Sequence, residues 1–214
     1  MLSIAELRPF VSATGITIGV LTASILGGVV LCTISTFTYL AGGRAARFFV
    51  PLLLSVFRNV PIVIFLIFSQ FVLPILFGLF MPALYNAVLV ISLVIAAYTF
   101  DIVRGYIHGF DLQQVDAARV LGFSRRQIIL AIVAPQFFLN QRENLFSIGL
   151  IGLKATAIAS IVSVQEITHT ANRIISQTAQ STIPIFVSTS LYIVIGLLLY
   201  AVAGLMWRQQ RPHD

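Results

Sequence analysis

The residues of this chain that could do chemistry gather in one polar stretch, residues 104–143, within otherwise apolar sequence. In that stretch Asp111 and Ser124 are each followed three positions later by a glutamine, Gln114 and Gln127. This is the spacing of a capping box, in which two side chains satisfy free backbone amides at the start of a helix. The stretch therefore predicts two short helices, which suit recognition of a partner better than catalysis.

These two expected helices meet at a glycine corner. The first runs through residues 115–121 and stops at Gly122, which can adopt a positive φ, and the second follows Ser124 and ends at Pro135. Ala118 and Gly122 are small and four residues apart, which leaves room for close approach by a partner surface. The pattern is equally compatible with an amphipathic hairpin that only links two membrane spans.

Two isolated charges, Lys154 and Glu166, lie inside or just after an apolar block. An ion buried in a bilayer is expensive unless it has a partner. Lys154 therefore either faces a translocation pathway, stabilising a carboxylate, or forms an interhelix pair or snorkels, and we expect the pair. We expect Glu166 to be a solvated carboxylate. Arg58 and Asp101 should form structural pairs, Asp101 with Arg104 at i+3.

Several kinds of chemistry are excluded by what the sequence lacks. The single cysteine, Cys32, excludes an intrachain disulfide and a multi-cysteine metal site, and the three histidines have no companions at ligand spacing. We therefore expect no metal and, without a Ser-His-Asp or paired-carboxylate constellation, no catalytic residue. A phosphate-binding P-loop needs Gly-Lys-Ser/Thr, whereas the one lysine lies between Leu153 and Ala155. The sequence therefore contains no P-loop for binding ATP.

The composition shows which elements must position these residues. Of the 214 residues, 58% are hydrophobic and 9% charged, against about 25% charged in soluble domains. This excludes a soluble enzyme, a disordered chain and a nucleic-acid-binding protein. Apolar blocks long enough for membrane helices of about 20 residues predict an all-α integral membrane protein, one domain over 1–214. Its five expected spans are residues 14–38, 48–72, 83–103, 144–164 and 183–207, with the polar 104–143 loop between the third and fourth.

The arginines orient these spans. Twelve of the thirteen basic residues are arginine. With a cytoplasmic C-terminus, nine arginines, Arg211 among them, fall in inside segments and two fall outside, as the positive-inside rule requires. We therefore expect the N-terminus outside and both the 104–143 loop and the C-terminus inside. The net charge of +6 then reflects the arginines that mark the cytoplasmic side of the membrane and does not indicate an anionic partner.

The polar loop resembles the cytoplasmic loop of importer-type ABC permeases, whose signature is Glu-Ala-Ala, three residues, Gly, nine residues, then Ile-x-x-Pro. Here Asp116-Ala117-Ala118 is followed by three residues, Gly122, nine residues, then Ile132-Val-Ala-Pro135, with Pro-Gln continued at Gln136. Flanking segments are similar to the polar amino-acid branch (histidine, lysine-arginine-ornithine, glutamine and opine types). They are Arg58-Asn59-Val60-Pro61 for Arg-Gly-Thr-Pro, Ala97-Tyr98 to Arg104-Gly105 for Ala-Tyr-x-x-Glu-x-x-Arg-Gly, and Lys154-Ala155-Thr156-Ala157 for Lys-Asp-Thr-Ser.

The resemblance implies a bacterial inner-membrane subunit of an ATP-driven importer of amino acids or related small polar solutes, working by alternating access. The implied partners are an ATP-binding cassette dimer, which would carry ATP and Mg and dock at residues 111–135, a second permease subunit, an external solute-binding protein, the bilayer and the solute. The implied coupling residues are Gln114, Asp116, Ala117, Ala118, Gly122 and Pro135. Glu166, at the place of a family Glu-Leu-Thr, would lie near an outer gate or a substrate amine. At Ala155 and Ala157 the chain lacks the family's acid and hydroxyl.

Two other classes fit the composition. A secondary, ion-coupled transporter predicts inverted repeats, yet five spans do not divide into equal halves and no repeat is evident. A non-transporting membrane scaffold has no need of the spacing in the 111–135 loop. That loop therefore favours the importer.

Overall fold

The computed structural model describes residues 8–208, with side chains through residue 204, and these residues form helices and short connections without a strand. An all-helical chain fits a bilayer because each helix satisfies its own backbone hydrogen bonds. The helices long and apolar enough to cross a membrane are α2 (Pro9–Ala41), α6 (Ala83–Gly109), α10 (Arg142–Ile158) with its 3-10 extension η3 (Ala159–Val162), and α12 (Thr182–Arg208). Arg211 lies outside the described residues.

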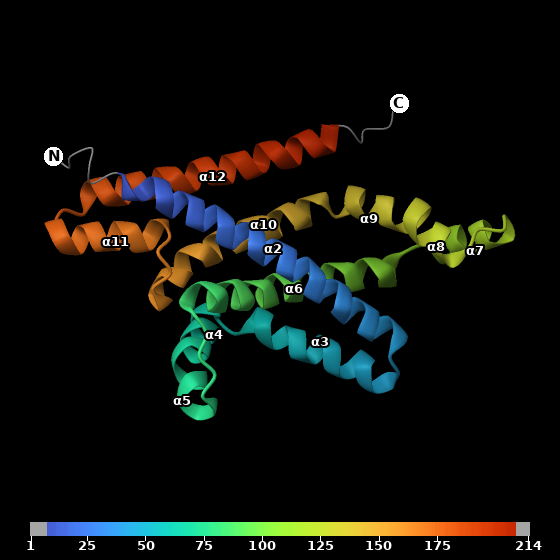
Figure 1. The fold of residues 1–214 in the computed structure, drawn as a ribbon. Coiled ribbons are helices and arrows are strands. Elements are labelled where there is room, and N and C mark those ends of the chain that lie inside the picture. Colours follow the sequence, from blue (N-terminus) through green and yellow to red (C-terminus); the bar gives the residue numbers. More distant parts are fainter. Residues whose placement is uncertain (1–7, 209–214) are drawn as a thin grey trace.

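The expected second span, residues 48–72, corresponds to two helical segments that meet at a bend. α3 (Arg44–Asn59) has Val60 as its C-terminal cap. The next helical segment turns away from α3 by 98° (Figure 1). That segment consists of α4 (Ile62–Ile67), the π-type turn η1 (Phe68–Val72) and α5 (Leu73–Phe77). Pro61 explains the break, because proline lacks an amide donor and disfavours a helical conformation in the residue before it. Four helices can span alone, and a fifth span exists if the bent pair crosses as one.

α2 and α6 form the centre of the bundle. At Gly28 of α2, an added Cβ would lie 2.4 Å from Cγ2 of Ile95 in α6, so only a glycine permits this approach. Between lipid-facing helices such close van der Waals packing, rather than the hydrophobic effect, drives association. Ile91, Ile95 and Ala155 are buried in the shared core, which joins α10 to the pair.

The polar loop carries the helices α7 (Leu112–Val120), α8 (Arg125–Ile128), the π-type turn η2 (Ile129–Val133) and α9 (Ala134–Asn140). The prediction that Pro135 ends the second helix is wrong. Pro135 lies in the first turn of α9, where a missing amide is tolerated, and the wider turn of η2 precedes it. The helical path therefore continues to Asn140.

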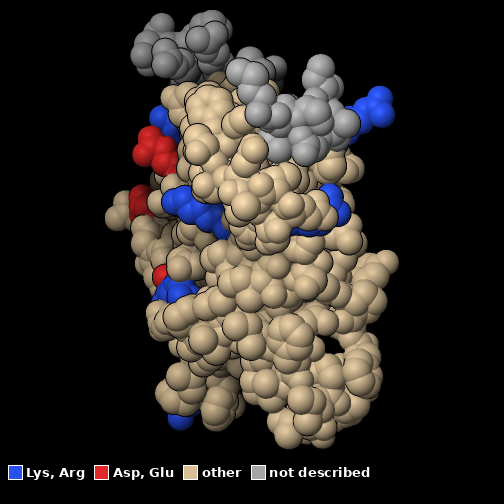
Figure 2. Space-filling view, turned by 90° about the vertical axis from the view of Figure 1, so that its left-hand side faces the viewer, with Lys and Arg blue, Asp and Glu red and all other residues tan. Residues whose placement is uncertain are grey.

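The surface agrees with a lipid environment. Large apolar side chains stand exposed around the bundle, such as Phe37, Ile75 and Phe186. Figure 2 looks onto the end of the bundle where α11 (Ile167–Thr178) lies, which is not a lateral face, and charged residues are few there as well. Figure 1 places α7 and α8 at the opposite end of the molecule from α11. The polar loop and the helix α11 that follows Glu166 therefore lie at opposite ends of the bundle.

Candidate functional site

The first candidate site is α7 and the glycine corner that ends it. Gly122 has a φ of +85°, as predicted, and the N–H of Phe123 donates to the carbonyl of Ala118 at 3.0 Å. Such a bond closes the helix by satisfying a free carbonyl. Nothing lies within 4 Å of a Cβ added at Gly122, so the backbone conformation, not space, is what requires glycine.

The capping at the two helix starts differs. At Ser124 the predicted box is confirmed: its N–H donates to Gln127 Oε1 at 2.8 Å, and the N–H of Gln127 donates to Ser124 Oγ at 3.4 Å. At Asp111 the box is wrong, since the carboxylate accepts only from the N–H of Gln113, at 2.9 Å, as the cap of α7. Gln114 is engaged elsewhere.

Gln114 holds α7 against α9. The amide Nε2 of Gln136 donates to Gln114 Oε1 at 2.9 Å. The sequence analysis predicted Gln114 as a coupling residue but not Gln136. The match of Pro135-Gln136 to the family's Pro-Gln pair could have pointed to Gln136. This bond joins the loop helix to the helix that continues into the membrane bundle.

The outer surface of α7 presents an unusual apolar tip. Val120 is 89% exposed and Leu121 76%, although both are aliphatic. Asp116 and Ala117 are exposed as well, and Asp116 pairs with Arg119 at 3.0 Å. Ala118, expected to make room for a partner, is instead buried against its own chain. An exposed aliphatic tip beside charges is suited to docking a protein surface.

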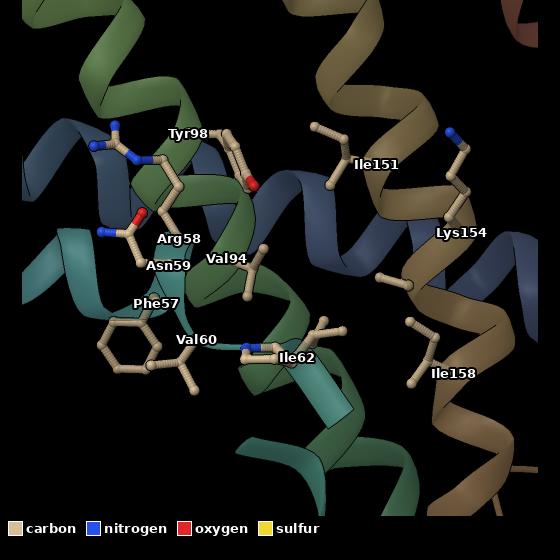
Figure 3. A pocket seen from close by; sticks show the side chains of 12 residues that line it. Phe57, Arg58, Asn59, Val60, Ile62, Val94, Tyr98, Ile151, Lys154 and Ile158 are labelled. Carbon is tan, nitrogen blue, oxygen red and sulfur yellow. The ribbon is translucent and has the colours of Figure 1, made fainter. Parts of the chain in front are cut away.

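The second candidate site is a cavity of about 290 Å³ at the α3–α4 break, closed by α6 and α10 (Figure 3). Most of its lining is apolar, and its polar side chains are Arg58, Asn59, Tyr98 and Lys154. Figure 3 shows Arg58 and Lys154 on opposite sides of this cavity, on different helices. The break at Pro61 creates the space, because it turns α4 away from the line of α3.

Arg58 lines the cavity and also forms an ion pair with an acid that does not line it. Its Nη1 lies 2.5 Å from Asp101 Oδ2, and Arg104 Nη2 lies 3.4 Å from the other carboxylate oxygen. The predicted pair of Asp101 and Arg104 is confirmed, and Arg58 is a further partner of the same carboxylate. Two guanidinium groups thus share one acid, which leaves a net positive cluster.

Lys154 does not form the expected interhelix pair. Among the described residues no carboxylate oxygen lies within 4 Å of its ammonium, and its side chain is exposed at the cavity. The carboxylate of Asp101 on α6 is paired instead with Arg58 and Arg104. Lys154 is therefore a cation available to a molecule outside this chain.

Glu166 is fully buried, so the expectation of a solvated carboxylate is wrong. Its Oε1 accepts from the N–H of His169 at 2.7 Å, which caps α11, and its Oε2 accepts from the hydroxyl of Tyr192 in α12. Burial raises the pKa of the Glu166 carboxyl, and these hydrogen bonds oppose the rise. The next residue, Ile167, donates its N–H to Thr17 of α2 at 3.3 Å. Glu166 thus lies where α11 folds back on α2 and α12.

Metal chemistry finds no support in residues 8–208, which contain no group of three or more His, Cys, Asp or Glu able to hold an ion. The two sites can dock a protein and hold a small polar molecule. Neither contains a nucleophile with an adjacent base.

A bundle of membrane-length helices with a capped and exposed helix pair on one loop is the architecture expected of a transport permease. Residues 15–211 match the family described as binding-protein-dependent transport system inner membrane component, and the chain belongs to that family. It is a multi-pass inner-membrane permease subunit of an ABC transport system. ATP is hydrolysed on a separate chain, and this chain carries no cofactor.

Relatives support this assignment along the whole chain. The arginine transport system permease protein ArtQ of Bacillus subtilis (strain 168) is 27% identical over 213 residues, covering 96% of this chain and 94% of ArtQ. The nopaline transport system permease protein NocM of Agrobacterium fabrum is 32% identical over 130 residues, covering 59% of this chain and 53% of NocM.

Solved structures show the same fold. The crystal structure of an amino acid ABC transporter with histidines superposes with a TM-score of 0.85 at 22% identity, covering 98% of this chain and 99% of that one. An inward facing conformation of the MetNI methionine ABC transporter gives a TM-score of 0.80 at 14% identity, covering 99% and 100% of the two chains. The arrangement of helices is therefore that of ABC permeases.

Proposed function

We propose that the chain is the permease subunit of an importer of amino acids or related small polar solutes, driven by an ATP-binding cassette dimer. The supporting observation is the α7 corner, where Gly122 ends a capped helix and Val120 and Leu121 stand exposed. A rigid helix of this kind can carry the closure of an ATPase dimer to the spans as a rigid body. Relatives named for arginine and nopaline transport support the amino-acid class.

The docking surface of the ATPase is proposed at residues 111–135. Asp116 and Ala117 would touch the partner directly, since both are exposed. Ala118 and Pro135 would shape the loop from within, and Gln114 would hold α7 against α9 through Gln136. Some coupling residues would therefore contact the ATPase, and the others would hold the loop in shape.

The translocation pathway is proposed to run past the cavity of Lys154, whose ammonium would meet a solute carboxylate. Glu166 would act at the outer end of that pathway by fixing α11 through Tyr192. A second permease subunit would close the pathway, which would open alternately to the two sides of the membrane. An external solute-binding protein would load it at the α11 end.

The topology is proposed as a single transmembrane domain over 1–214 with the N-terminus outside and the C-terminus in the cytoplasm. This orientation puts α7 and the arginine-rich loop inside and α11 outside. The bent pair of α3 and α4 would serve as the remaining span.

The coupling role is tested by Gly122→Val in the complex purified with its ATPase and reconstituted in liposomes. A valine at φ +85° strains the backbone, so we expect ATP-driven uptake to fall while the complex still assembles. Gly109→Val is the matched control, because it has open space and no positive φ. Normal uptake by the Gly122 variant would exclude this corner as the coupling element.

A further inference from the structure

The cavity of Lys154 contains no acid. Five carboxylates occur in the described residues, namely Asp101, Asp111, Asp116, Glu143 and Glu166, and none of them lines the cavity. Its other polar side chains, Asn59 and Tyr98, can both donate hydrogen bonds. The lining therefore contains positive charge and hydrogen-bond donors but no negative charge.

Two acids outside the cavity lining, Asp101 and Glu166, already have partners within the chain. Asp101 is held by Arg58 and Arg104, and Glu166 is buried and accepts from Tyr192 and the His169 amide. A cationic solute would have to displace an arginine or a buried hydrogen bond to reach either carboxylate. Both exchanges cost free energy, because they leave a charged or buried group without its partner.

The cavity also has a second positive centre. Arg58 lines both this cavity and the adjoining one of about 230 Å³ that contains Asp101 and Arg104. One carboxylate and two guanidinium groups leave that cluster with one net positive charge. Lys154 supplies another on the opposite side, as Figure 3 shows. At Ala155, beside Lys154, this chain has an apolar wall residue where the family it resembles has an acid.

We propose that this cavity selects anionic solutes, such as acidic amino acids and related dicarboxylates, over cationic ones. Two separated positive centres match two carboxylates, whereas a basic amino acid would bring its side-chain cation against Lys154 with no acid to compensate. The inference rests on the proposed function, because it assumes that solute passes this cavity.

The test measures binding of radiolabelled L-glutamate, L-glutamine and L-arginine to the purified permease–ATPase complex without any solute-binding protein, so that selectivity belongs to the membrane subunits. Glutamate and glutamine have the same shape and differ by one charge. We expect glutamate to bind more tightly than glutamine, and arginine most weakly. Lys154→Met should reduce the glutamate-to-glutamine preference by about tenfold.

Arg173→Met is the matched control, since it removes an equal charge from an exposed position on α11. Tightest binding of arginine, or an equal loss for all three solutes in Lys154→Met, would overturn the proposal; the second result would show that Lys154 binds only the common α-carboxylate. ATP-driven uptake is measured separately in liposomes with the solute-binding protein. Selective binding without any uptake would refute the proposed function alone.

Discussion

Replacing Tyr192 by phenylalanine removes a hydroxyl that donates to the fully buried carboxylate of Glu166. That hydroxyl donates to Glu166 Oε2 and lies 3.1 Å from Thr168 Oγ1, while Glu166 itself has 0% exposure. A hydrogen bond to a charged group contributes about 1.5–3 kcal/mol, and a buried acceptor left without a donor costs about 1–3 kcal/mol. The His169 amide still serves the other oxygen, so we expect the free energy of unfolding to fall by about 2 kcal/mol.

The assay is equilibrium unfolding of the purified permease in mixed micelles of a non-ionic detergent and SDS, followed by circular dichroism. Tyr39→Phe is the matched control, because it removes the same atom from a more exposed bond, 2.9 Å long, to His108 Nε2. That bond should contribute less than about 1 kcal/mol, since water can replace the partner. If Tyr192→Phe costs no more than Tyr39→Phe, then Glu166 does not hold α11 to α12 and our account of this contact is refuted.

Three further changes test the rest of the structure. Burial raises the pKa of Glu166 above its ordinary value of 4.5, so the folded state binds that proton more tightly than the unfolded chain does. The contribution of Glu166 to the free energy of unfolding therefore falls as the pH rises above 4.5. Glu166→Gln should remove this slope from the pH profile of the free energy of unfolding. Gln136→Leu and Gln114→Leu should each lower solute imported per ATP hydrolysed, and the double variant should add little, with unfolding changed by about 1 kcal/mol or less because the pair is exposed. Gly28→Ala should destabilise the bundle by about 1–3 kcal/mol through overpacking, whereas Gly19→Ala in the same helix has open space and should not.

Each of these has a result that would count against it. A steeper pH profile in Glu166→Gln would mean that another group causes the slope. Additive losses for Gln114 and Gln136 would show that they act separately. Equal stability of the two glycine variants would contradict the close approach of α2 and α6.

Features governed by neighbours in sequence could be predicted. The capping box at Ser124 and the positive φ of Gly122 depend on a few adjacent residues, and both are as expected. The pair of Asp101 and Arg104 lies one helical turn apart, so its geometry also follows from the helix. The same local rules missed the 98° turn at Pro61, although proline is a helix breaker, because the residues on both sides of Arg58-Asn59 are apolar enough to be assigned to one span.

The roles of Lys154 and Glu166 required the tertiary structure. Whether a charge is paired or solvated depends on which helices lie beside it, and those contacts join residues far apart in the chain. Glu166 is buried where α11 folds back onto Tyr192 and Thr17. Lys154 has no carboxylate within ion-pair distance among the described residues, whereas Asp101 is paired with Arg58 from another helix. The amino-acid sequence by itself determined a helical membrane protein with a capped loop, since hydropathy and capping are local. Only the packing of the helices decided which ions are available to a solute, because desolvation and pairing are properties of the assembled bundle.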